Sequence, residues 1–83
     1  LPPLEPNLNK LTIDAGDRLL WNGSVTSREE LGALLQLTRR MPVEPELQFE
    51  PDALASYDAS ARTLATIKAS GVTKFGFVGN ERY

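Results

Sequence analysis

The strongest constraint on the fold is the stretch of residues 56–79, in which a helical repeat leads through one glycine into an alternating pattern. Ser56 is suited to cap the N-terminus of this helix, and Gly71 is suited to end it. After Gly71, Phe75 and Phe77 alternate with small or charged residues, which predicts a strand with both rings on one face, and we expect both rings to lie in the core. The predicted core stripe of the helix is Tyr57, Ala61, Leu64 and Ile67.

The rest of the chain supplies a hairpin, a helix and a further strand. Alternating residues predict strands at 10–14 and 18–21, joined by a turn, and Asn22 with Gly23 closes the second strand. Two overlapping capping boxes, Thr26 with Glu29 and Ser27 with Glu30, precede a predicted helix at 28–40, and a strand follows at 46–50. We therefore predict a small α+β or α/β fold with the order β-β-α-β-α-β, in which two helices pack on one face of a mixed sheet.

The length of 83 residues allows one domain, which we place at residues 10–83. Residues 1–9 are rich in proline and are predicted to form a flexible N-terminal arm. The chain opens on Leu1 and has a single methionine, Met41, so we expect a fragment of a longer protein. No apolar run approaches the roughly 18 residues of a membrane span, and we expect this piece to be soluble.

Composition excludes several classes of function. The chain has no histidine and no cysteine, which removes Ser-His and Cys-His nucleophilic sites and thiolate metal sites, and we expect neither enzymatic activity nor a cofactor. A net charge of −2 argues against a nucleic-acid surface. Arg39 and Arg40 form the one adjacent basic pair and are suited to complement the C-terminus of a helix.

The acidic residues admit a functional and a structural interpretation. Asp14 and Asp17 have the ligand type of a cation site, but their spacing is typical of a turn. Glu50, Asp52 and Asp58 would meet where the third strand joins the second helix, a place where open α/β sheets often bind ligands. Each of these acids also has a structural role of its own, as a strand-end, loop or helix-dipole charge, and the structural interpretation is favoured.

Two further features concern surfaces. Trp21 and Tyr57 are candidates for stacking on a ligand, although their strand and helix positions favour the core. Gly76 leaves one place on the second face of the sheet without a side chain, which suits the close approach of another backbone. We expect no helix to cover that second face, whose candidate residues are Leu20, Gln48, Glu50, Gly76 and Val78.

Four features follow one another between Phe49 and Glu81: an Asp-containing turn, a Tyr that opens a helix, a Ser-Gly stop and a strand of the form K-x-G-x-V-G-x-E. This stretch reads FEPDALASYDASARTLATIKASGVTKFGFVGNE. Together with the N-G-x-x-T-x-x-E pattern that begins at Asn22, this order resembles the C-terminal periplasmic domain of the ExbD/TolR family, with ExbD the better match. The resemblance runs from about Leu11 to Glu81. Pro51 departs from the family, which usually has a small residue before the Asp.

The resemblance implies a periplasmic interaction domain, the soluble part of a single-span inner-membrane protein in a motor driven by the proton motive force. Such subunits are homodimers that work with an ExbB-like membrane protein and pass energy to TonB for outer-membrane transport. The proton-carrying Asp of the family lies in a transmembrane helix that is not part of this sequence. The alternatives are a TolR-like domain that contacts peptidoglycan and a small ligand-binding lobe.

The contact surface expected for a TonB-like partner or a second copy centres on the last strand. A partner segment would add to an edge of the sheet, and the extended N-terminal arm would take part. The strand-helix junction at Asp52 and Tyr57 would serve a ligand or cell-wall contact. The residues predicted for these contacts are Lys74, Gly76, Val78, Gly79, Asp52, Tyr57 and Leu4.

Overall fold

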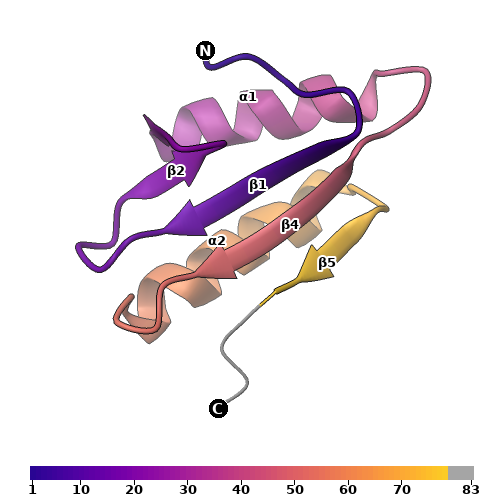
Figure 1. Cartoon of the computed structure of the whole chain (residues 1–83). Coiled ribbons are helices and arrows are strands. Elements are labelled where there is room, and N and C mark those ends of the chain that lie inside the picture. The colour runs from indigo at the N-terminus through magenta and orange to yellow at the C-terminus, as the bar shows by residue number, and fades with distance from the viewer. Residues whose placement is uncertain (79–83) are drawn as a thin grey trace.

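The computed structural model, which describes residues 1–78, is a mixed sheet covered by two helices on one face (Figure 1). The sheet has five strands in the order β3-β2-β1-β4-β5. Strands β1, β4 and β5 are parallel, and β2 runs antiparallel to both β1 and β3. The predicted fold class is confirmed. The elements are β1 (Leu8–Ile13), β2 (Leu19–Trp21), β3 (Ser24–Thr26), α1 (Arg28–Arg39), β4 (Glu46–Pro51), α2 (Tyr57–Ser70) and β5 (Phe75–Phe77).

Strand β3 was not predicted. Asn22 and Gly23 both have positive φ, 49° and 87°, as a tight hairpin turn between twisted strands requires. The chain therefore reverses after Trp21 and pairs once more, with Leu19 opposite Thr26. A strand of three residues with one apolar side chain, Val25, is too short to show an alternating pattern in the sequence.

The N-terminal segment joins the fold earlier in the chain than predicted. Strand β1 begins at Leu8, two residues early, and the fully buried Asn9 accepts a hydrogen bond from the Glu5 backbone nitrogen at 2.8 Å. The Asn9 side chain also accepts a 2.9 Å hydrogen bond from Nδ2 of Asn22. Leu4 packs partly against the core. The mobility of the arm stays a prediction.

Helix α1 begins and ends close to its predicted bounds. Of the two predicted capping boxes, the one that closes uses Ser27 and Glu30: Oγ of Ser27 accepts from the Glu30 backbone, and the Glu30 carboxylate accepts from the Ser27 backbone at 2.8 Å. The buried leucines of the helix belong to the same hydrophobic core as Trp21 and Phe49 of the sheet, both fully buried. The buried face of the helix consists of Leu31, Leu34, Leu35 and Thr38.

The predicted core face of α2 is wrong in part. Tyr57 is 88% exposed, and the buried residues are Ala59, Thr63 and Ile67. Thr63 can lie on this buried face because its hydroxyl donates a hydrogen bond to the carbonyl of Ala59 at 2.8 Å, so the hydroxyl is not left without a partner. A stripe spaced by four residues therefore faces the sheet, and Leu64 lies half-buried beside it. The predicted Ser56 cap and the Gly71 stop are confirmed.

The prediction that both aromatic rings of the last strand lie in the core is also wrong in part. Phe75 is half-buried and packs against the core, whereas Phe77 is 50% exposed. The ring of Phe77 meets that of Phe49 edge to face, with centroids 5.6 Å apart. Phe77 stays half exposed because β5 is the last strand of the sheet, so only one neighbouring strand shields it.

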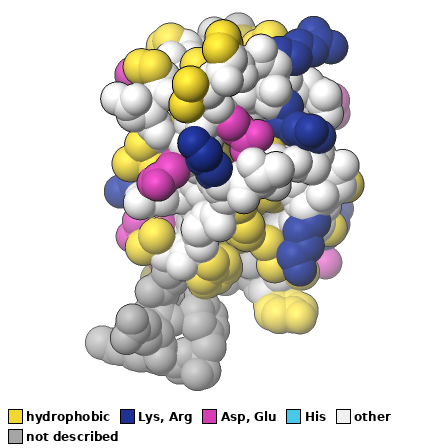
Figure 2. All heavy atoms as spheres, turned by 90° about the vertical axis from the view of Figure 1, so that its right-hand side faces the viewer, with side chains coloured by type: hydrophobic (Ala, Val, Ile, Leu, Met, Phe, Trp, Pro, Cys, Tyr) yellow, Lys and Arg dark blue, Asp and Glu magenta, His cyan; other side chains and the backbone are white. Residues whose placement is uncertain are grey.

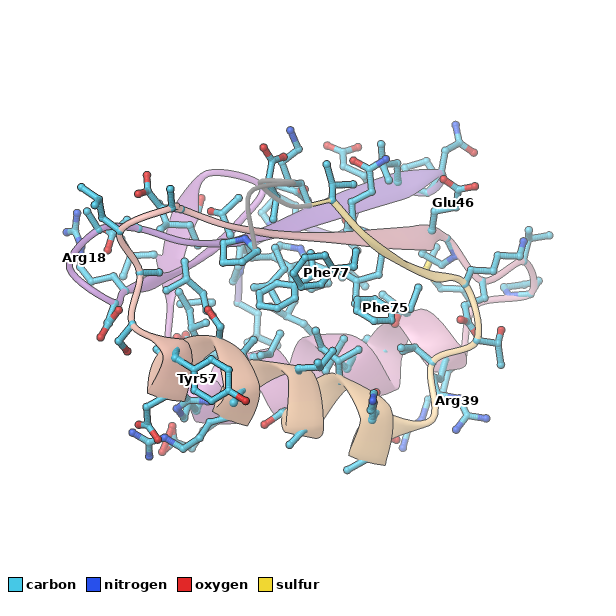
Figure 3. The ribbon with its side chains drawn as sticks, turned by 90° about the horizontal axis from the view of Figure 1, so that it is seen from below. Arg18, Arg39, Glu46, Tyr57, Phe75 and Phe77 are labelled. Atoms are coloured by element: carbon cyan, nitrogen blue, oxygen red, sulfur yellow. The ribbon has the colours of Figure 1, made fainter. Side chains whose placement is uncertain are left out.

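No helix covers the second face of the sheet within residues 1–78, as predicted; Figure 3 shows both helices on one side and polar side chains standing on the other. Gly76 lies opposite Gln48 in this face, and Lys10 forms a 3.5 Å ion pair with Glu50. Both partners of the ion pair are about half exposed, so it stabilises the sheet only slightly. This face is open to solvent or to another molecule.

The corrected face of α2 can be tested by substitution. We expect Ile67→Val to lower the free energy of unfolding by about 1 kcal/mol, because a buried methylene is lost from a packed core. Tyr57→Ala should change it by less than about 0.5 kcal/mol, since an exposed side chain contributes little. Urea denaturation of both variants checks this, and a larger loss for Tyr57→Ala than for Ile67→Val would contradict the observed face.

Candidate functional site

The first candidate surface is the β5 edge, which we define as residues 74–78. Strand β5 is the last of the sheet and pairs with β4. The Leu47 nitrogen donates to the Lys74 carbonyl and the Val78 nitrogen to the Phe49 carbonyl, each at 2.8 Å, so the inner side of this segment is held by the sheet. The structure thus places the predicted residues Lys74, Gly76 and Val78 along one outer strand. Gly79 lies outside the described residues.

The β5 edge leaves room for another chain on the uncovered face. Gly76 is exposed, and a Cβ atom added to it would meet nothing within 4 Å. Val78 is 40% exposed. A shallow depression of about 210 Å³ lies here between β4 and β5. Its lining residues are Glu46, Leu47, Gln48, Lys74, Phe75, Gly76 and Val78.

The side of the molecule on which β5 lies combines apolar and charged zones. Figure 2 shows hydrophobic side chains at the top and in the lower part of this side, Lys and Arg mainly along its right margin, and acidic groups near its middle. Interfaces between separately folded proteins are about as apolar as the rest of a protein surface, so this mixture does not by itself mark a contact surface. The edge position of β5 and the space at Gly76 are the features that favour a contact here.

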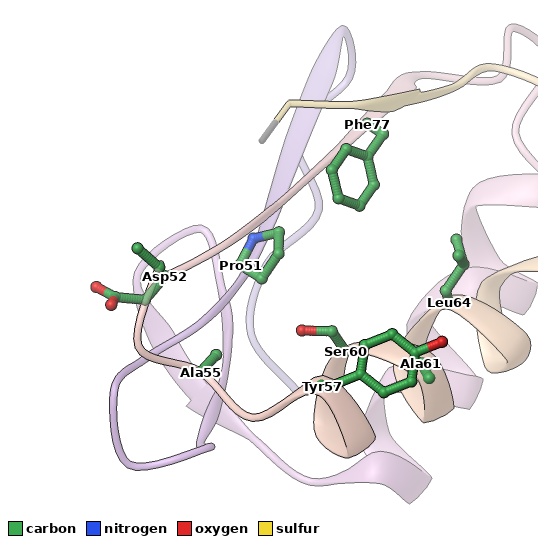
Figure 4. A pocket seen from close by; sticks show the side chains of 9 residues that line it. Pro51, Asp52, Ala55, Tyr57, Ser60, Ala61, Leu64 and Phe77 are labelled. Carbon is green, nitrogen blue, oxygen red and sulfur yellow. The ribbon is translucent and has the colours of Figure 1, made fainter. Parts of the chain in front are cut away.

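A pocket of about 470 Å³ opens where β4 and β5 end and α2 begins (Figure 4). It brings together the predicted residues Asp52 and Tyr57, and its walls are mainly the apolar side chains of Pro51, Leu64 and Phe77. In Figure 4 the Asp52 carboxylate points away from the interior of the pocket. It accepts a 2.8 Å hydrogen bond from the Leu54 nitrogen, as in an Asx turn. The interior thus offers mainly apolar contact.

The acidic residues that were candidates for a ligand or metal site do not cluster in space. Glu50 pairs with Lys10 on the uncovered face, Asp58 pairs with Arg62 at 3.1 Å on α2, and Asp52 holds its own turn. No group of three or more His, Cys, Asp or Glu residues in the described part of the chain is arranged to hold a metal ion. Each of these three acids thus has a structural contact of its own.

The turn at residues 14–17 is also structural. Oδ1 of Asp14 accepts hydrogen bonds from the backbone nitrogens of Gly16 and Arg18. The backbone hydrogen bond from Arg18 is the largest of the effects that hold the pKa of Asp14 below 3.8. Asp17, at φ 66°, reaches across the fold to accept from the Ser56 nitrogen at 2.8 Å. That hydrogen bond lowers the pKa of Asp17 and ties the hairpin to the start of α2, beside the pocket.

Two residues hold the loop leading into β5: Glu44, which sequence reasoning missed, and Arg39, for which it predicted a helix C-terminus without saying which helix. Oε2 of Glu44 accepts from the Thr73 nitrogen at 2.7 Å, the Lys74 nitrogen at 3.1 Å and the Thr73 hydroxyl at 3.1 Å. Partial burial favours the neutral acid, but these hydrogen bonds outweigh it, so the pKa of Glu44 lies below 4.5. Arg39 was assigned to a helix C-terminus, and its Nη1 donates to the Ser70 carbonyl at the end of α2, 3.2 Å away. These contacts span 29 to 31 residues and leave no local signal.

The Asp17 contact predicts a dependence of stability on pH. A carboxylate whose folded-state pKa is lowered contributes stability above its ordinary pKa of 3.8, and this contribution is lost as the pH falls through the folded-state value. Asparagine tolerates the positive φ of position 17, so Asp17→Asn removes the charge alone. We expect wild type to be more stable than Asp17→Asn at pH 7 and the two to converge near pH 2, as measured by urea midpoints. A constant difference would contradict this role.

Comparison with known proteins places the chain in a family. A family model described as "Biopolymer transport protein ExbD/TolR" matches residues 2–81. A protein of Xanthomonas campestris pv. campestris named "Biopolymer transport protein exbD2" is 33% identical over 79 residues, which cover 93% of this chain and 54% of the relative. The chain therefore spans about half of that relative's length. Within residues 1–78, no helix has the length and apolarity needed to cross a membrane. The chain belongs to the ExbD/TolR family.

Proposed function

We propose that this chain is the periplasmic interaction domain of an ExbD-like subunit in an inner-membrane motor driven by the proton motive force. In this proposal the domain dimerises and passes energy to a TonB-like protein for transport across the outer membrane. An ExbB-like partner would be contacted through the membrane part of the subunit. Family membership supports this role, and the better match to ExbD than to TolR at residues 78–81 favours the TonB branch of the family.

The observation that supports a binding role most directly is the position of β5 at the end of the sheet. An edge strand can be extended by a strand from another chain, which supplies affinity through main-chain hydrogen bonds and specificity through alternate side chains. Gly76 and Val78 give an incoming chain space on the uncovered face. We place the TonB-like segment at this edge.

A second copy of the domain is proposed to pack on the uncovered face. Val25, at 59% exposure, and the half-buried Leu20 present apolar surface on this part of the sheet. Burial of apolar surface would add stability to a chain too short for a large core. Leu4 already packs partly on its own domain, so only its exposed part is available to such a contact.

A TolR-like contact with peptidoglycan is the second candidate, and the pocket at Asp52 and Tyr57 favours it. The exposed Tyr57 ring and the Ser60 hydroxyl line this pocket and provide stacking and hydrogen-bonding groups, and the Asp52 carboxylate lies at its rim, pointing outward. Other small ligands would use the same pocket. The two candidate functions use different surfaces and can therefore be separated by substitution.

Partner binding at the β5 edge can be tested by NMR titration of the labelled domain with the periplasmic segment of a TonB-like protein. We expect shifts at Lys74, Gly76 and Val78 in wild type. Gly76→Lys should weaken binding at least roughly tenfold, because lysine on an edge strand opposes the addition of another strand and the site has room for it without distortion. Ser24→Lys, on the opposite edge strand β3, is the matched control and should bind like wild type. The absence of shifts at millimolar excess would refute the proposal.

The peptidoglycan alternative predicts retention of the domain on purified cell-wall sacculi. If the pocket makes this contact, Tyr57→Ala and Asp52→Ala should each reduce the retained fraction several-fold, whereas Gly76→Lys should leave it unchanged. Sedimentation with sacculi measures this. Equal retention of all three variants and wild type would exclude the pocket as the contact.

A further inference from the structure

Two connecting segments lie side by side at one end of the molecule. Residues 40–45 lead from α1 to β4 and residues 71–74 lead from α2 to β5; Figure 1 shows both at the right-hand end of the fold, and Figure 3 shows Arg39 beside the second of them. The first segment contributes a carboxylate, Glu44, and the helix before it a guanidinium, Arg39. Both reach groups of the second segment or the helix end before it.

Glu44 satisfies the first backbone donors of the chain as it enters β5. One carboxylate oxygen accepts three hydrogen bonds, two from consecutive backbone nitrogens and one from a hydroxyl, at 2.7 to 3.1 Å. Hydrogen bonds to an ionised carboxylate are stronger than those between neutral groups. Lys74 is thereby fixed at both backbone groups, because its nitrogen donates to Glu44 and its carbonyl accepts from Leu47.

Arg39 holds the same loop from the helix side. Its Nη1 donates to the Ser70 carbonyl, and the guanidinium lies over Gly71, where an added Cβ atom would clash with Nη1. Gly71 also has φ 81°, a conformation that favours glycine. The loop between α2 and β5 is thus closed by side chains from another part of the chain at both of its ends.

Strand β5 needs such support, because it is only three residues long and its pairing with β4 covers three residue pairs. Short edge strands are among the first segments to open in native proteins, since few hydrogen bonds and little buried surface hold them. Fixing Lys74 sets the register of the strand from the residue that precedes it. The positions of Phe75, Gly76 and Val78 are then determined by the chain that continues from Lys74.

We infer that Glu44, assisted by Arg39, is a positioning residue for the β5 edge: it does not contact the partner, but keeps the edge strand ordered in the register to which a partner strand adds. The part of this inference that concerns the partner rests on the proposed function. The part that concerns the order of β5 stands on the hydrogen bonds alone.

The experiment compares amide hydrogen exchange by NMR in wild type, Glu44→Ala, Glu44→Gln and Glu29→Ala. We expect Glu44→Ala to speed exchange of the Val78 and Leu47 amides, which bind across β4 and β5, by roughly tenfold or more. The Asp52 amide, which donates to Ile13 of β1, should change little. Glu29→Ala removes an exposed carboxylate from the first turn of α1, an element that does not pair with β5, and should leave all three amides unchanged.

A second measurement uses the same variants in titrations with the TonB-like segment. Glu44→Ala should weaken binding at least roughly threefold and Glu29→Ala should not, while Glu44→Gln, which keeps an acceptor oxygen, should recover part of the affinity. Uniformly faster exchange at all amides in both Glu44 variants would show a general structural role and overturn the inference, as would unchanged exchange at Val78. Opening of β5 with unaltered affinity would overturn the link to the partner. If wild type binds no TonB-like segment and Glu44→Ala still opens β5, the proposed function is refuted and the ordering role of Glu44 stands.

Discussion

The parallel pairing of β1 with β4 is the interaction on which the rest of the fold depends. It aligns six residues of each strand and joins the N-terminal hairpin to the helix-strand unit at the C-terminal end of the chain. Leu11 and Phe49, both fully buried, lie opposite each other in this pairing. Because the ladder sets which side chains face the helices, the same register sends Lys10, Thr12 and Glu50 to the uncovered face. One register thus determines both the core and the surface left for other molecules.

Local patterns predicted most of this fold because they report local physics. The Ser27–Glu30 box, the Ser56 cap and the Gly71 stop are satisfied within a few residues, and each is found where it was predicted. The face of α2 was assigned incorrectly because hydrophobicity alone selects Tyr57, whereas the sheet accepts Thr63, whose hydroxyl is satisfied inside the helix. The strand β3 was missed because three residues carry no readable period.

The candidate surfaces were partly predictable for a different reason. Lys74, Gly76 and Val78 lie within one five-residue segment, so their proximity follows from the sequence. The meeting of Asp52 with Tyr57 in a pocket follows from a strand leading into a helix. Glu44 had no such signal, and for Arg39 the sequence indicated a helix C-terminus but not which one. Their partners are about thirty residues away, and only the packing of α1 and β4 against α2 and β5 brings the two connectors together. Sequence reasoning therefore located the surface and missed the contacts that hold it.

In the proposed function, in which the domain passes energy to a partner, the unequal lengths of the parallel ladders have a mechanical consequence. The hydrogen bonds of a parallel ladder are evenly spaced along the strand, so a pull along that strand is resisted by more bonds when more residues are paired. The ladder between β1 and β4 aligns six pairs, and the one between β4 and β5 aligns three. A tension applied through a strand added at β5 would therefore be limited by the outermost ladder, which would slip or detach while the centre of the sheet stayed intact. Under tension, the contact with the partner would then be lost at β5 before the centre of the domain unfolds.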